Sequence, residues 1–381
     1  MGGLRILITN NTLSDRAGSE LYVRDLALEL LRRGHTPIAY SPRPGQIGEE
    51  MRRATIPVVD RLDALGAPPD VIHGQHHLPT MEALLTFVDT PAVYFCHGWL
   101  PWEEAPPRFP RIYRYVAVDD TCGDRVLLES GVPESQLRVI LNFVDLDRFS
   151  PRPPLPPKPQ RALVFSNYAS DETHLGVIRA TCARLKLPVD VIGAASGTAV
   201  AAPERVIGGY DVVFAKGRAA LEALAVGAAV ILCDAVGAGP MVTTRDLAQL
   251  RRANFGIRAL RHPLTPEILL EELQRYDAAD AMSVSRTIRQ SASLQDATDE
   301  ILDVYGEVLD EHRRRPPTVP DSEARATAAY VRWLGLRLTM RNEPRRELRG
   351  SRVGTYRGGV RRVLRRLRRE LHRLWRRRDE R

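Results

Sequence analysis

The residue types best suited to binding a phosphate group follow an apolar run near the middle of the chain. Residues 211–215 (DVVFA) form this run, and Lys216, Gly217 and Arg218 come directly after it. A helix is expected to begin here, and its first N–H groups carry partial positive charge, so two cations beside them favour a diphosphate. The next apolar run opens into a stretch with Gly237 and Gly239, expected to be a loop that a ligand can approach closely.

Glu222 is a lone carboxylate on the otherwise apolar helix expected over residues 219–226. A carboxylate in apolar surroundings is costly unless it bonds a partner. One suitable partner is the diol of a ribose, which would place a nucleotide beside Lys216 and Arg218. The alternative is an ion pair with Arg218, four residues earlier on the same helix face.

A second candidate phosphate site follows the first apolar run, residues 4–9. There a polar loop delivers Gly18 and Ser19 to the start of a helix expected from Glu20 to Arg33. Gly18 allows close backbone approach, and the exposed N–H groups would attract a phosphate. The alternative is an ordinary turn between a strand and a helix, capped by the serine.

Histidines stand at the ends of two further expected strands. His97 ends the run 92–96, where it can donate a hydrogen bond to a bound ligand or simply cap the strand. His73, His76 and His77 stand together, but no carboxylate or cysteine lies beside them at metal-ligand spacing. We therefore expect no bound metal. The four widely separated cysteines are expected to be buried free thiols of a reducing compartment.

Short apolar runs alternate with helix-like segments, and these elements must position the side chains named above. Strands are expected at residues 4–9, 36–41, 70–73, 92–96, 115–118, 138–140, 162–166, 189–193, 211–215 and 229–233. The alternation predicts an α/β fold with two doubly wound, Rossmann-like domains. Ligands of such domains bind beyond the carboxyl ends of the strands, which is where the candidate residues lie.

Proline-rich segments mark the expected domain boundaries. Residues 150–160 hold six prolines in eleven residues, and such a stiff run cannot enter a sheet. We assign residues 1–150 to the first domain, residues 151–312 to the second, and residues 313–381 to a linker and a basic helical tail. A hinge at residues 150–160 would let the two domains face each other across a cleft.

The positive charge of the chain is concentrated at its end. The whole chain carries +8, whereas residues 351–381 carry thirteen arginines and three acids, a net of +10, so residues 1–350 sum to −2. Apolar residues recur every three or four positions over residues 359–378, which predicts an amphipathic helix with arginine on its other faces. Such a helix suits an anionic membrane surface.

Other partners for the tail are the protein body, a second copy or a polyanion such as RNA, although the near-neutral body argues against nucleic acid. Residues 331–338 (VRWLGLRL) are a second patch expected to help hold a membrane. No run of 18 apolar residues and no leader-like segment is evident. We expect a cytoplasmic protein, peripheral at the inner face of the membrane when its tail binds lipid.

Several of these segments together resemble the group 1 (family 4) glycosyltransferases, which have the GT-B fold. They span about residues 4–310 and include DVIHGQHHLP, VYFCHGW, LRVILNFVDLDRF and ALEALAVGAAVI. The resemblance implies transfer of a sugar from a nucleotide diphospho-sugar to an acceptor hydroxyl, with retention and without a metal. The donor is a co-substrate, and no cofactor is implied. With the basic tail, a carbohydrate or lipid-linked acceptor of the membrane or envelope is expected.

The resemblance carries roles to individual residues. Gly18 would lie near the donor phosphates and His97 near the donor sugar. Asn142 and Asp145 match the N-x-V-D segment at the cleft or hinge, with phenylalanine in place of its usual glycine. Glu222 matches the second glutamate of the E-x7-E motif, which contacts the nucleotide ribose.

The chain also departs from the family pattern. Phe214 stands where the first glutamate of the motif is expected. Asn167 and Thr173 stand near the places of the Arg and Lys that hold the diphosphate, and Lys216 and Arg218 are candidates to supply the missing cations. Two rivals therefore stay open: a non-catalytic GT-B-like scaffold at a membrane surface, and another GT-B activity such as a nucleotide-sugar epimerase.

Overall fold

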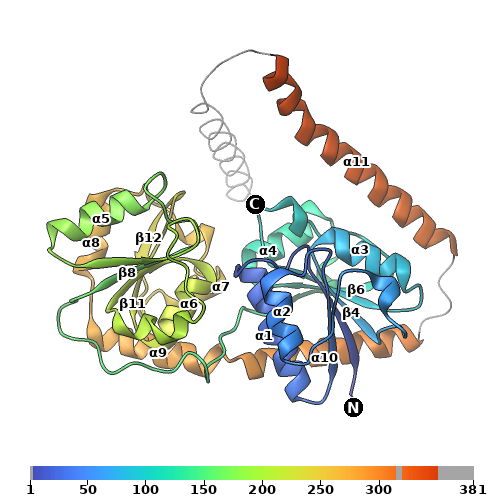
Figure 1. Cartoon of the computed structure of the whole chain (residues 1–381), viewed down its shortest axis with the longest axis horizontal. Helices are drawn as coiled ribbons and strands as arrows, with labels where there is room; N and C mark the ends of the chain where they lie inside the picture. Colours follow the sequence, from blue (N-terminus) through green and yellow to red (C-terminus); the bar gives the residue numbers. More distant parts are fainter. Residues whose placement is uncertain (1–2, 315–319, 351–381) are drawn as a thin grey trace. The chain divides into compact units, whose positions relative to one another are not determined.

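The computed structural model describes residues 3–314 and 320–350 and forms two compact units, Met1–Val319 and Pro320–Arg381 (Figure 1). In the second unit the described part is a single helix, α11 (Pro320–Gly350), which carries the patch 331–338. Val331, Leu336 and Leu338 are exposed on it. None of the described helices combines the length and the apolarity that a membrane span requires. The predicted amphipathic segment 359–378 lies outside the described residues.

The first sheet has seven parallel strands in the order β3-β2-β1-β4-β5-β6-β7. They are β1 (Arg5–Thr9), β2 (Thr36–Tyr40), β3 (Val58–Val59), β4 (Val71–Gln75), β5 (Ala92–Cys96), β6 (Ile112–Ala117) and β7 (Leu137–Val139). The sequence missed β3, because two residues are too short to show a pattern. The other six strands lie where their apolar runs predicted them.

Helices cover both faces of the first sheet. On one face lie α1 (Gly18–Arg32), α2 (Gly45–Arg53) and α10 (Leu294–Arg314), whose apolar side chains share one core with the sheet. On the other face lie α3 (His77–Thr86) and α4 (Asp120–Asp124). Helix α1 has Glu20 in its first turn and Arg32 in its last, the charge order that the helix dipole favours.

The second sheet has the order β12-β11-β10-β8-β9. Its strands are β8 (Ala162–Phe165), β9 (Val189–Ile192), β10 (Val212–Ala215), β11 (Ala229–Asp234) and β12 (Gly237–Met241). Helices α5 (Leu175–Arg184) and α8 (Pro266–Gln274) cover one face, and α6 (Gly217–Val226), α7 (Leu247–Arg252) and α9 (Ala278–Ser291) cover the other. Both sheets with their helices are Rossmann-like, as the alternation of the sequence predicted.

The expected loop at Gly237 and Gly239 is instead a buried edge strand, β12, antiparallel to β11. A Cβ atom on Gly237 would lie 2.7 Å from the carbonyl oxygen of His262, and one on Gly239 would lie 2.6 Å from that of Ala259. The two glycines therefore let β12 pack closely against the backbone of residues 259–262. The predicted role of Gly237 and Gly239 in ligand binding stays a prediction, because the packing of β12 already accounts for both glycines.

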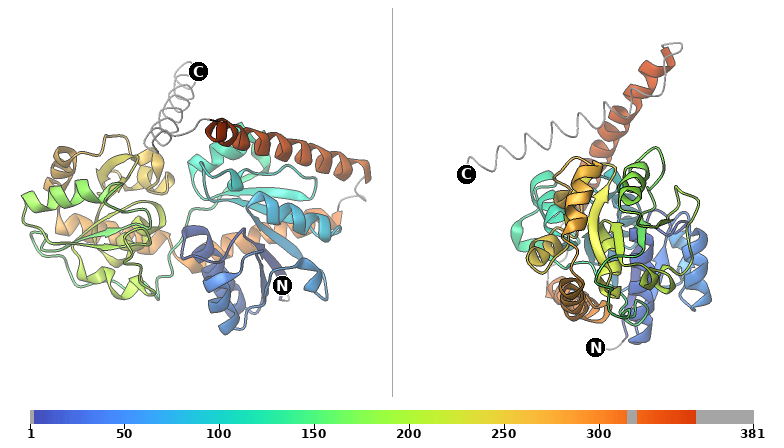
Figure 2. Two further views of the ribbon diagram at one scale, coloured as in Figure 1. Left: turned by 45° about the horizontal axis from the view of Figure 1, so that its top comes forward. Right: turned by 90° about the vertical axis from the view of Figure 1, so that its left-hand side faces the viewer.

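The chain crosses between the two sheets twice. The first crossing is the connection between β7 and β8, and its proline-rich part, residues 150–160, contains no helix or strand, as the prolines predicted. The second leads into α10, which we had assigned to the second domain up to residue 312. This helix instead packs on the first sheet, where Ile301 and Tyr305 are fully buried in its core (Figure 2). A domain boundary placed along the sequence therefore misassigns α10, because its apolar stripe is buried on the other sheet.

Candidate functional site

Each sheet has one point where the strand order reverses, and parallel sheets bind ligands beyond the strand ends at such a point. In the first sheet it lies between β1 and β4, and in the second between β8 and β10. The loops that follow these strands contain most of the candidate residues. The candidate site is therefore defined by the loops at the two reversal points.

Two contacts bring these reversal points together. The side-chain amide of Asn167, after β8, donates a hydrogen bond to the carbonyl oxygen of Arg16, after β1, at 3.0 Å. The guanidinium of Arg218, at the start of α6, forms an ion pair with the carboxylate of Asp25 on α1. The carboxyl ends of both sheets thus meet at one place.

Asp25 is the centre of a buried ion cluster. Its carboxylate is 1% exposed and contacts three guanidinium groups, those of Arg24, Arg148 and Arg218. Burial alone would raise the pKa of Asp25, but the three arginines hold it below its ordinary value. Three positive charges surround this one carboxylate, and further acids pair with them: Glu50 with Arg24, Asp145 with Arg148, and a second buried acid with Arg218.

That second acid is Glu222, whose Oε1 accepts a hydrogen bond from Nε of Arg218 at 2.8 Å. The ion pair weighed as the alternative for Glu222 is therefore present. Burial raises the pKa of Glu222 more than Arg218 lowers it. Arg218 cannot act as a free cation for a diphosphate in this arrangement, because both of its acids are buried with it.

Lys216 stands at the amino end of α6 and forms an ion pair with Asp234 at the end of β11. Its ammonium lies 5.8 Å from the centre of the exposed Tyr168 ring, and its side chain is 34% exposed. The buried His174, whose Nδ1 lies 3.8 Å from Asp234, completes this group. Unlike Arg218, Lys216 can therefore exchange its partner for an anion from solvent.

His97 lies where the sequence placed it, after β5, and its side chain contacts α1. Its ring centre is 4.3 Å from that of Tyr22, and the Arg218 guanidinium is close enough to both groups to interact with them electrostatically. Burial lowers the pKa of His97 to about 4, so the imidazole is neutral at pH 7. Its Nε2 atom is buried and has no hydrogen-bond partner among the described residues, so one hydrogen-bonding position of the ring is unused.

The other three histidines have structural partners. His73 is fully buried, and its Nδ1 lies 2.5 Å from the hydroxyl of Tyr305 on α10. His76 receives a hydrogen bond from the backbone N–H of Asn11, and its Nε2 lies 3.3 Å from Glu104. His77 is the first residue of α3, its ring centre lies 4.8 Å from that of Trp102, and burial lowers its pKa to about 4. The residues that the structure describes contain no group of three or more possible metal ligands.

Glu104 is a residue of the candidate site that the sequence analysis did not predict. It lies 28 residues after His76 in a short turn, yet it is buried and binds both His76 and the backbone N–H of His97, at 3.0 Å. Burial would raise the pKa of Glu104, but His76 holds it below its ordinary value. Nothing in the local pattern of residues 100–105 marks this acid.

Gly18 and Ser19 begin α1, as expected, but the serine is not its cap. The cap is Ala17, which offers no side-chain acceptor, and the hydroxyl of Ser19 donates to Glu20 at 2.8 Å. A Cβ atom on Gly18 would meet nothing within 4 Å. The first turn of α1 therefore presents backbone N–H groups that no side-chain cap occupies.

The remaining candidates lie at the crossing between the sheets or in the core. The carbonyl of Asn142 accepts from Arg251, and the Asp145 carboxylate accepts from the backbone N–H of Arg148 at 3.1 Å, so both residues organise the first crossing. Phe214 is fully buried within β10, which leaves no acid at its position. The hydroxyl of Thr173 bonds only its own loop.

Comparison with known proteins finds a family match in the first part of the chain. Residues 16–148 match the model of Glycosyltransferase Family 4. The match includes α1, His97 and the segment with Asn142 and Asp145. The resemblance seen in the sequence is confirmed. No curated protein matches the chain.

Solved structures define the fold of the whole body. A glycosyltransferase from Rickettsia africae ESF-5 is 16% identical with a TM-score of 0.58, covering 81% of this chain and 99% of that one. Anabaena Alr3699/HepE, in complex with UDP and glucose, is 15% identical with a TM-score of 0.56, covering 80% and 99%. The apo lipopolysaccharide outer core galactosyltransferase WaaB is 12% identical with a TM-score of 0.51, covering 79% and 99%. These likenesses assign the chain the GT-B fold.

Proposed function

We propose that this protein is a glycosyltransferase that moves a sugar from a nucleotide diphospho-sugar to an acceptor hydroxyl. The observation that carries the proposal is the meeting of the two reversal points, through Asn167 with Arg16 and through Arg218 with Asp25. A donor with a nucleotide at one end and a sugar at the other is long enough to contact the loops at both reversal points. The match of residues 16–148 to the family 4 model supports the same chemistry.

The donor diphosphate is assigned to the amino ends of α1 and α6. The first turn of α1 at Gly18 supplies uncapped backbone N–H groups, and Lys216 supplies the cation by exchanging Asp234 for phosphate. Arg218 is reassigned from a direct ligand to a positioning residue, because it is held by Asp25 and Glu222. Glu222 keeps its proposed place beside the ribose through the oxygen that Arg218 does not bind.

The sugar is assigned to the surroundings of His97. Neutral imidazole with an unpartnered Nε2 suits a hydrogen bond to a sugar hydroxyl and does not repel the positive charge that develops on the sugar ring.

As the bond between the anomeric carbon and the diphosphate oxygen breaks, the helix N–H groups and Lys216 stabilise the negative charge on the leaving diphosphate. The acceptor oxygen then bonds the anomeric carbon, and its proton passes to the departing phosphate. Attack on the vacated face gives retention, and the step requires no metal.

The acceptor is proposed to lie at a membrane surface. Residues 351–381 carry a net charge of +10, and residues 359–378 have the sequence pattern of an interfacial helix. A protein held on an anionic leaflet meets lipid-linked or envelope glycans there. We therefore propose a cytoplasmic enzyme, peripheral at the inner face of the membrane.

A donor panel tests the proposal. UDP-, GDP-, ADP-, CDP- and dTDP-sugars are added in turn to the whole chain while its thermal unfolding is followed. A donor at ~100 times its dissociation constant stabilises by about 2.7 kcal/mol, a shift of a few degrees. We expect one nucleotide to give this shift and Lys216→Ala to reduce it. His97→Ala should keep the shift from the matching nucleoside diphosphate but lose sugar transfer, measured by mass spectrometry.

His35→Ala is the matched control. His35 directly precedes β2, at the amino end of a strand of the same sheet and away from the candidate site, so its replacement should leave transfer unchanged. No shift with any donor would favour the non-catalytic scaffold. Conversion of the donor sugar to its epimer, without transfer, would favour the epimerase.

A further inference from the structure

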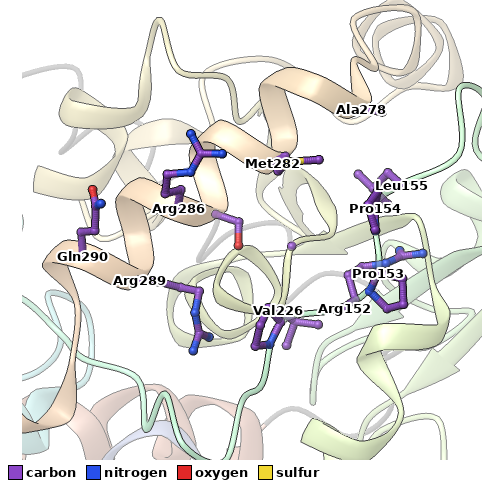
Figure 3. Close-up of a pocket in the computed structure, with 13 residues that line it drawn as sticks. Arg152, Pro153, Pro154, Leu155, Val226, Ala278, Met282, Arg286, Arg289 and Gln290 are labelled. Atoms are coloured by element: carbon purple, nitrogen blue, oxygen red, sulfur yellow. The ribbon is translucent and has the colours of Figure 1, made fainter.

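A pocket of about 360 Å³ lies on the second sheet's side of the crossing, away from the residues assigned to the donor (Figure 3). Its walls are the crossing segment 151–155, the end of α6 and one face of α9. The donor is assigned to the first residue of α6, and this pocket touches the last, about 15 Å along a ten-residue helix. Its volume lies within the range of small-molecule sites.

One end of the pocket is apolar. Pro153, Pro154 and Leu155 form one wall, and Val226 and Met282 face them from α6 and α9. In Figure 3 the side chain of Met282 extends toward Leu155 and Pro154. Proline has no N–H group to donate, so this wall offers a ligand ring and methylene surface rather than hydrogen bonds.

The other end of the pocket is cationic. Arg286 is exposed, and no hydrogen bond or ion pair is recorded for it within the described residues. Arg289 donates to backbone carbonyls and has no carboxylate partner among the described residues. Of the three arginines at the pocket, only Arg152 is balanced by an acid, Asp211, and its Nε is buried without an acceptor. Two positive charges are therefore left for a ligand to neutralise.

We propose that this pocket binds an amphipathic anion, a short apolar chain or ring that carries one phosphate or carboxylate group. The apolar part packs between Pro154 and Met282, and the anionic head lies at Arg286 and Arg289. Both features are needed, because the exposed cations alone would bind any anion weakly in water. A nucleotide sugar does not fit this chemistry, since its sugar end is polar.

The pocket adjoins both crossings between the sheets. Arg289 donates to the carbonyls of Leu146 and Phe149, at 3.2 and 2.7 Å, and so holds the first crossing against α9. The second crossing pairs with the first, because the N–H of Val144 donates to the carbonyl of Ala292 at 2.8 Å and the N–H of Leu294 donates to the carbonyl of Val144 at 2.9 Å. A ligand that bridges residues 151–155 and α9 would therefore slow the opening of both crossings.

Calorimetric titration of the whole chain tests the proposal with four probes: hexyl phosphate, hexanoate, inorganic phosphate and hexanol. We expect the two amphipathic anions to bind and the phosphate ion and the alcohol to bind at least about tenfold more weakly. Arg286→Gln and Met282→Gln should each weaken hexyl phosphate binding by at least about tenfold. Both side chains are exposed, so neither change disturbs the core.

The control variant is Arg179→Gln, an exposed arginine of the same domain on α5, where binding should stay unchanged. Amide hydrogen exchange at Val144 and Leu294 should slow when hexyl phosphate is bound. Equal affinity for hexanol, or full affinity in both pocket variants, would overturn the proposal. The second outcome would assign the probe to another surface, such as the basic tail. None of these readouts depends on glycosyl transfer.

Discussion

At the scale of single residues, two histidines of the first sheet differ in their hydrogen bonding. Both His73 and His97 lie toward the carboxyl ends of neighbouring parallel strands, β4 and β5. His73 is fully buried and bonded to Tyr305, whereas the Nε2 of His97 has no partner. Burial lowers the pKa of both, so both are neutral at pH 7. Only His97 can therefore offer a hydrogen bond to a ligand.

The buried ion cluster gives a prediction at this scale. Asp25→Asn leaves Arg218 and two further guanidinium groups without their shared carboxylate, and breaking a buried pair typically costs about 3–5 kcal/mol. The folded-state pKa of Asp25 is depressed, so its contribution is complete above the unfolded value of about 3.9 and is lost as pH falls through the folded value. Urea unfolding should therefore show a large deficit for the variant at pH 7 that narrows below about pH 4.

Asp299→Asn is the matched control, because Asp299 pairs with Arg33 at the surface and its side chain is 67% exposed. Exposed pairs contribute about 0–1 kcal/mol, so this variant should unfold close to the wild type. Equal deficits in both variants, or a deficit for Asp25→Asn that does not change with pH, would contradict the role given to the cluster.

At the scale of elements, α10 connects the two domains, because it follows the second domain in the sequence and packs on the first sheet. Its apolar stripe is buried on the first sheet although its sequence follows the second. The contact between Tyr305 and His73 fixes its register, since both groups are fully buried and each is polar. Helix α10 thus completes the core of the first domain, although it follows the second domain in the sequence.

Tyr305→Phe tests how strongly the contact with His73 holds α10 on the first sheet. The change keeps the ring but leaves Nδ1 of His73 buried without its partner, which costs about 1–3 kcal/mol. We expect the melting temperature to fall by a few degrees and α10 to exchange its amide hydrogens faster. Tyr168→Phe, at a 64% exposed tyrosine, should change neither quantity. Equal protection of α10 in both variants would show that its apolar contacts alone hold the helix.

At the scale of the whole molecule, the charge is divided between a body near neutrality and a tail of +10. Each arginine near an anionic leaflet contributes about 1 kcal/mol, and the contribution is screened by salt. In the proposed function the body carries the chemistry, and the tail is predicted to hold it at an anionic membrane surface.

Vesicle sedimentation tests this division. The whole chain should bind vesicles with anionic lipid and not vesicles of neutral lipid, and deletion of residues 351–381 should abolish binding. Replacing Leu364, Leu367 and Leu371 with glutamine keeps the charge but removes the apolar stripe. This variant should bind at low salt and detach near 0.15 M salt, where the Debye length is about 8 Å. Binding to neutral lipid, or equal binding of the stripe variant at every salt concentration, would contradict an interfacial helix.

The sequence by itself determined what depends on neighbours along the chain. Apolar runs located ten of the strands, because a buried parallel strand is apolar on both faces. The helix expected over residues 219–226 does end there, capped by Gly227 with a left-handed φ of 103°, a backbone conformation that glycine adopts without strain. Several sequence segments over about residues 4–310 were also enough to indicate the family, and the match of residues 16–148 to its model confirms the resemblance.

Only the tertiary structure decided which charges are free. Arg218 meets Asp25 across 193 positions, and Glu104 meets His76 in a turn with no distinguishing pattern. The loop expected at Gly237 became a strand because the backbone of residues 259–262 lies against it. The physical reason is the same in each case. The free energy of a buried charge or an edge strand depends on the partner that folding brings to it, and that partner is distant in the sequence.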